Sequence, residues 1–128
     1  MISISTALQS LGITEWVLRG EPTSEVEFNA MFTKVVGTDA HGSAIESSDP
    51  ADFGVTWTQV KAKYDELVAA EPMRLLRAER NQRLANTDWW ASSDLTMTEA
   101  QTDYRQALRD VTDTYTSLDD VVWPEEPV

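Results

Sequence analysis

Residues 100–115 read AQTDYRQALRDVTDTY and carry the strongest periodic pattern in the chain. Counted from Ala100, the apolar residues lie at offsets of 0, 4, 7, 8, 11 and 15 residues, a spacing typical of one face of an α-helix. Thr96 with Glu99, or Thr98 with Gln101, provides a capping box at the start of this helix. The face predicted to pack in the core consists of Ala100, Tyr104, Ala107, Leu108, Val111 and Tyr115.

A second helix is expected immediately before it, from Met73 to Asn86. Pro72 disfavours helical angles at the preceding residue and suits the first position of a new helix. Residues 87–94 have the composition of a turn, so the two helices are predicted to form an antiparallel hairpin. The last residues, 116–128, are expected to be an extended tail that docks back on the domain through Trp123.

The first half of the chain is predicted to contain shorter elements. A short helix after Ser5 and a strand over residues 13–19 are followed by a helix from Ser24 to Val35. Residues 37–54 then lack any apolar period and predict a long loop that is mobile or used for binding.

Only one short strand is expected within that loop, at residues 43–46. A further helix begins at a capping box formed by Thr56 and Gln59 and ends before Pro72. The sequence therefore predicts an α+β, mainly helical fold. A small α/β part with a short strand pair (residues 1–72) is followed by the helical hairpin and its docking tail (residues 73–128), and the two form one compact unit.

Composition excludes several classes of function. The chain has no Cys and one His, His41, so thiol chemistry and a zinc site are not expected. It has no phosphate-binding glycine pattern and no serine with a credible histidine partner. We therefore expect no cofactor, no metal and no catalytic residue. Because carboxylates are abundant, a glycan-cleaving accessory enzyme with a carboxylate pair stays open as a remote alternative.

The net charge of −12 is unevenly distributed along the chain. Residues 73–86 carry +3, whereas the segments before and after carry −7 and −8. This balance disfavours nucleic acid and anionic membranes as partners, since phosphate binding needs clustered Lys and Arg. No apolar run is long enough for a transmembrane helix, and residues 1–5 do not have the pattern of a signal peptide.

Tryptophans are the first group of candidate binding residues, because Trp is enriched at the anchors of protein interfaces. Trp89 and Trp90 are adjacent, so their side chains diverge and one of them is expected to be exposed. Both belong to the predicted partner-binding site, and we predict Trp90 as the exposed anchor. The other tryptophans are expected to lie in the core, and these are Trp16, Trp57, Trp89 and Trp123.

Arginines are the second group, and they allow two interpretations. In the first, they pair with carboxylates of the same chain. Structural ion pairs are then predicted across the hairpin, between Arg80 or Arg109 and Asp88 or Asp110. In the second, they form a basic face that docks an acidic partner, made of Arg74, Arg77 and Arg83.

Four short patterns within residues 74–124 resemble, in order and spacing, the phage tail assembly chaperone (tail fibre assembly-like) family. They are Leu76-Arg77-Ala78-Glu79-Arg80-Asn81, Leu84-Ala85-Asn86-Thr87-Asp88-Trp89, Tyr104-Arg105-Gln106-Ala107-Leu108-Arg109-Asp110 and Val122-Trp123-Pro124. The chain departs from the family pattern at Arg83, where a second Leu is usual, and at Trp90, where a polar residue is usual.

This resemblance implies a protein that binds a phage tail or tail-fibre protein, either in the host cytoplasm during assembly or in the virion tail. No catalytic residues come with the family. The first hypothesis is a transient assembly factor. The alternative is a permanent component of the tail or fibre, and a homo-oligomer is compatible with both.

Overall fold

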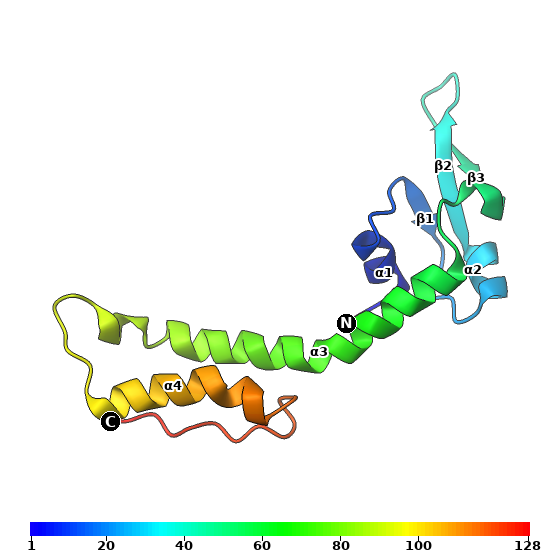
Figure 1. Cartoon of the computed structure of the whole chain (residues 1–128). Coiled ribbons are helices and arrows are strands. Elements are labelled where there is room, and N and C mark those ends of the chain that lie inside the picture. The colour runs from blue at the N-terminus through cyan, green and yellow to red at the C-terminus, as the bar shows by residue number, and fades with distance from the viewer. The chain divides into compact units, whose positions relative to one another are not determined.

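The computed structural model describes all 128 residues and has an α+β fold with four α-helices and one three-stranded antiparallel sheet (Figure 1). The chain divides into two compact units, Met1–Ala69 and Ala70–Val128. None of the helices combines the length and the apolar composition that a membrane span requires.

Unit 1 contains the sheet and its covering helices. Helix α1 (Ile4–Ser10) is followed by strand β1 (Trp16–Leu18) and helix α2 (Glu25–Met31). Strands β2 (Phe32–Thr38) and β3 (Ala44–Ser47) form a hairpin, and a short 3-10 helix, η1 (Pro50–Asp52), leads to helix α3 (Trp57–Ala85). The strand order is β1-β2-β3, so the predicted strand pair is extended by a third strand.

Three phenylalanines form the centre of the core of unit 1. The rings of Phe28, Phe32 and Phe53 are fully buried, with centroids 4.6–5.9 Å apart. Trp16 and Trp57 are partly buried against this cluster, as expected from the sequence. Edge-to-face and offset contacts of this kind add to the stabilisation that burial of the rings provides.

The predicted helix from Ser24 to Val35 is wrong in its second half, because α2 ends at Met31 and the chain continues directly into β2. The apolar spacing of these residues is compatible with a helix and with a strand, but the residues after Phe32 are rich in β-branched side chains, which favour a strand. Antiparallel pairing with β1, which comes earlier in the chain, supplies the backbone hydrogen bonds that β2 needs as a strand.

The predicted long loop at 37–54 is wrong in part, and the short strand predicted within it is present. β2 continues to Thr38, and β3 occupies Ala44–Ser47, one residue from the short strand predicted at 43–46. Between Val35 and Gly37 the register with β3 shifts, which is a β-bulge that leaves Val36 without a partner. The last residues of β2 and nearly all of β3 are exposed on both faces of the hairpin, so the sequence shows no alternation of apolar and polar side chains there.

Unit 2 begins inside α3. Because α3 runs without interruption through Pro72, the helix break predicted there is wrong. A proline within a helix removes one backbone donor and crowds the preceding turn, and this does not stop a helix whose neighbours all favour it. The side chain of Arg74 reaches back across Pro72 to the carboxylate of Glu71, with its Nε 2.8 Å from Oε2. This contact lowers the pKa of Glu71 and raises that of Arg74.

Helix α4 (Glu99–Thr114) begins at the predicted capping box of Thr98 and Gln101. Two contacts join it to α3: Arg80 donates to the carbonyl of Arg109 (3.1 Å), and Arg105 donates to the carbonyl of Leu84 (2.9 Å). A later residue of α3 thus meets an earlier residue of α4, so the two segments run antiparallel (Figure 1). The buried residues of this part of the chain include Leu76, Trp90, Tyr104, Leu108 and Val111.

Candidate partner-binding site

The turn after α3 holds the most exposed tryptophan of the chain. Trp89 and Trp90 lie in a short 3-10 helix, η2 (Asp88–Ala91), and their rings meet edge to face, with centroids 6.2 Å apart and planes at 74°. Trp90 is 6% exposed and packs on Tyr104 with ring centroids 6.0 Å apart, whereas Trp89 is 62% exposed. The predictions that Trp90 is the exposed anchor and that Trp89 lies in the core are therefore both wrong.

The choice between the two tryptophans depends on how η2 meets α4. Trp90 completes an apolar cluster with Tyr104 and Leu108, against which Leu84, Met97 and Trp123 also pack. The same turn geometry directs the neighbouring indole of Trp89 to the surface. Trp is enriched among the residues that dominate binding at protein interfaces, so the exposed Trp89 is a candidate contact for another protein.

Arg105 fixes the turn that carries Trp89. It is only 8% exposed, and its guanidinium donates to the carbonyl of Leu84 (2.9 Å), to Oγ1 of Thr87 (2.7 Å) and to Oδ1 of Asp88 (2.8 Å). A guanidinium presents its donors in a rigid planar fork, so three acceptors held at once allow little freedom to the segment between them. The end of α3 and the start of η2 are thereby tied to α4.

Sequence reasoning missed Arg105 as a functional residue, although a signal existed. Arg105 lies three residues before Leu108 and six before Val111, so it shares the buried face of α4 with them. An arginine on such a face has to be neutralised by acceptors on the neighbouring segment. Thr87 and Asp88 provide them, and both residues belong to one of the patterns that resemble the phage family.

The ion pairs predicted for Arg80 and Arg109 across the hairpin are wrong, whereas Asp88 does form one, with a different arginine. Arg80 donates to the carbonyl of Arg109 and to the side chain of Asn81, and it contacts no carboxylate. The side chain of Arg109 makes no ion pair. Asp88 pairs with Arg105 instead, because that residue faces the turn, and Asp110 accepts from Gln106 one helical turn earlier (3.0 Å).

Of the basic residues predicted to bind an acidic partner, two are engaged within the chain. Arg74 pairs with Glu71, and Arg83 pairs with Glu79 (3.0 Å). Arg83 also covers the ring of Trp123, 4.2 Å from its centroid, and so helps to hold the docked tail. Only Arg77 is exposed without an ion pair. The first interpretation, pairing with the chain's own carboxylates, therefore describes Arg74 and Arg83.

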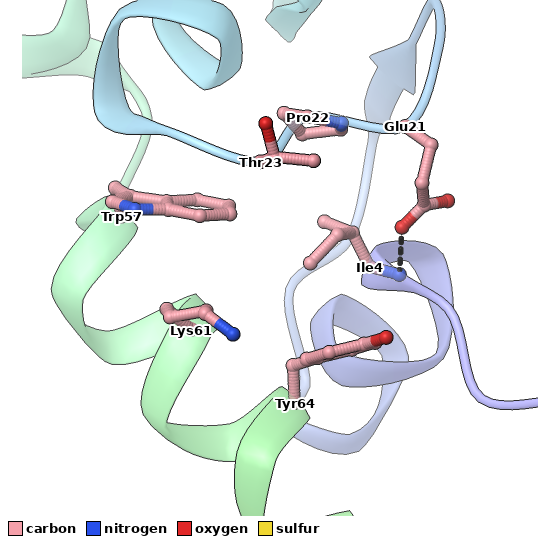
Figure 2. A pocket seen from close by; sticks show the side chains of 7 residues that line it. All are labelled: Ile4, Glu21, Pro22, Thr23, Trp57, Lys61 and Tyr64. Atoms are coloured by element: carbon pink, nitrogen blue, oxygen red, sulfur yellow. Dashed lines mark hydrogen bonds between the residues drawn. The ribbon is translucent and has the colours of Figure 1, made fainter. Parts of the chain in front are cut away.

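Unit 1 and unit 2 each contain a small pocket whose lining groups are not arranged for catalysis. The one in unit 2, of about 230 Å³, is polar and is bordered by Arg83, already engaged with Glu79, and by Glu126. The one in unit 1, of about 190 Å³, lies between Trp57, Ile4 and Tyr64, as Figure 2 shows.

The two charged groups at the pocket of unit 1 already have partners. Glu21 accepts from the backbone N–H of Ile4 at 2.8 Å (Figure 2). The ammonium of Lys61 points into the pocket between Trp57 and Tyr64, and it forms an ion pair with Asp65 at 2.7 Å. No group of three or more His, Cys, Asp or Glu side chains is placed to hold a metal ion.

Residues 73–128 match the family model of the phage tail assembly chaperone proteins. This match confirms the resemblance over residues 74–124, and the matched region lies entirely within unit 2. It contains Trp89, Arg105 and the acceptors that surround the guanidinium of Arg105. The phage tail assembly chaperone family is not a family of enzymes. No curated protein and no solved structure matches the chain.

The phage tail assembly chaperone patterns now have a structural meaning. The Thr87-Asp88 pair supplies acceptors, Tyr104-Arg105 supplies the ring and the guanidinium, and the two patterns meet across the hairpin. Trp123 of the closing pattern packs on the same cluster. These residues build the support of the turn, and Trp89 is the aromatic side chain that the turn leaves exposed.

Proposed function

We propose that this protein is a phage tail assembly chaperone that binds a tail or tail-fibre protein, with Trp89 as the anchor of the contact. The match of residues 73–128 to the phage tail assembly chaperone family supports the class of partner. The observation that carries the assignment of the site is the 62% exposure of Trp89 on a turn fixed by Arg105.

Rigidity of the turn favours this use of Trp89. A side chain that is already held in its binding conformation loses little conformational entropy when a partner covers it. The interactions of Arg105 and the packing of Trp90 act on residues 87, 88 and 90, on both sides of the indole. Trp89 is therefore presented in a defined position.

Replacing Trp89 by alanine is expected to weaken binding of the cognate tail protein about tenfold or more, since interface tryptophans commonly contribute about 1.4 kcal/mol or more. The measurement is a titration of the purified full-length protein with each tail and fibre protein of the phage in turn. Leu118→Ala is the matched control, because it shortens another exposed apolar side chain of unit 2. Equal affinities of Trp89→Ala and wild type for the bound tail protein would contradict the site.

We propose a transient role, in the host cytoplasm, over a permanent place in the virion tail, because the matched family is described as one of assembly chaperones. Mass spectrometry of purified particles is expected to detect none of the protein. In the infected-cell lysate it is expected to be bound to a tail protein. A stoichiometric, symmetry-compatible copy number in particles would instead make it a component of the tail or fibre.

A further inference from the structure

We infer that the tail-protein segment that covers Trp89 is an apolar segment flanked by Lys or Arg. The inference rests on the proposed function and adds the chemistry of the partner to it. Its basis is the segment from Asp88 to Asp103 that carries Trp89, which combines exposed apolar side chains with exposed carboxylates and contains no Lys or Arg.

The apolar part of the surface consists of Trp89 and Leu95, which are 62% and 50% exposed. Two successive turns connect them: Ser92 N–H donates to the carbonyl of Trp89 (3.1 Å), and Leu95 N–H donates to the carbonyl of Ser92 (3.0 Å). The segment between the two residues is thus compact. Such a pair of side chains offers a partner an aromatic and an aliphatic contact on one short segment.

The charged residues of the segment that carries Trp89 and Leu95 are all acidic. Between Asp88 and Asp103 the chain has four carboxylates and no Lys or Arg, and all four residues are exposed. They are Asp88, Asp94, Glu99 and Asp103. The next charged residue in the chain is Arg105, but it is buried, and its guanidinium donates to Leu84, Thr87 and Asp88. Asp88 uses only Oδ1 for Arg105, and its side chain is 66% exposed.

The negative charge of this segment indicates which kind of partner can bind to it. A carboxylate-rich border around an apolar contact attracts cations and repels like charges at short range. The net charge of −12 adds a longer-range field of the same sign, which disfavours a second copy of this chain at this surface. The partner is therefore a different protein that presents apolar side chains between basic ones.

Two synthetic peptides of equal length test this inference on the full-length protein. They share the same apolar residues, including Leu and Phe, and differ only in flanking Lys in one and Glu in the other. The Lys peptide is expected to bind about tenfold or more tightly at low salt, and the difference is expected to shrink as salt is added because ions screen exposed charges. Trp89→Ala is expected to weaken binding of the Lys peptide.

The double variant Asp94→Asn with Glu99→Gln is expected to weaken binding of the Lys peptide several-fold. The matched control is Asp113→Asn with Asp119→Asn, which removes the same charge from exposed, unpaired carboxylates elsewhere in unit 2. Equal losses in the two double variants would show that only the total charge matters and would overturn the inference. Equal binding of the two peptides would overturn it as well.

These outcomes are separate from those that test the proposed function. If Trp89→Ala weakens binding of the tail protein but the two peptides bind equally, the site stands and the basic partner segment is wrong. If Trp89→Ala leaves binding of the tail protein unchanged, the proposed site itself is wrong.

Discussion

Replacing Trp90 by alanine lowers the free energy of unfolding by about 3–5 kcal/mol, the usual cost of removing a large aromatic side chain from a core. Trp90 is buried between η2 and α4, and its ring contacts Tyr104 within the cluster that includes Leu108. Removing it leaves a cavity that the rigid hairpin fills only in part. Urea denaturation followed by circular dichroism measures the change.

Trp89→Ala is the control for this experiment, since it removes the same indole group from the neighbouring residue. Its ring is mostly in water, so the free energy of unfolding should stay within about 0.5 kcal/mol of wild type. A larger loss of stability for Trp89→Ala than for Trp90→Ala would mean that η2 directs its two indoles the other way. The site proposed above would then have to move to Trp90.

Replacing Arg105 by alanine is expected to lower the free energy of unfolding by about 2–3 kcal/mol, because the substitution removes three hydrogen bonds and the packing of a mostly buried side chain. The carbonyl of Leu84 and the hydroxyl of Thr87 lie in part-buried positions, whereas Asp88 regains water. The turn should loosen at the same time, so binding of the tail protein should weaken although no contact atom of the partner has been removed.

Arg109→Ala provides the comparison for Arg105→Ala. Arg109 lies one helical turn later on α4, its side chain is exposed, and only its backbone carbonyl, which alanine retains, accepts from Arg80. Stability and binding should therefore be close to those of wild type. If Arg105→Ala behaves like Arg109→Ala in urea denaturation, the buried guanidinium does not fix the turn.

Local signals were sufficient for the elements whose ends are decided by neighbouring residues. The capping boxes of Thr56 with Gln59 and of Thr98 with Gln101 are both present, and the apolar period of residues 100–115 predicted α4 to within a residue at each end. These interactions span three or four residues, so the sequence contains all the information they need.

Elements that depend on distant residues were not predictable in the same way. The spacing of Phe28, Met31 and Phe32 fits a helix, and only pairing with β1 decides that Phe32 begins a strand. At Pro72 the local rule favours a break, yet the helix continues because a single lost donor is outweighed by good helix formers on both sides.

In the candidate site, too, some features are decided by neighbouring residues and others by residues that are distant in the sequence. That Trp89 and Trp90 would diverge followed from their adjacency, but which ring is buried depends on where Tyr104 and Leu108 lie across the hairpin. The arginine ladder of α3 drew attention through its regular spacing. The arginine that matters most for the turn, Arg105, is inconspicuous because its three acceptors lie at least 17 residues away in the chain.

The three acceptors of Arg105 also constrain how this protein can diverge. A substitution of Asp88 leaves the guanidinium with one acceptor fewer, and a substitution of Arg105 removes the hydrogen bonds that tie Thr87 and the carbonyl of Leu84 to α4. Changes at positions 87, 88 and 105 should therefore accumulate together in descendants of this sequence. Position 89 is free of that linkage, so the residue that we propose as the anchor can change while the turn beneath it stays the same.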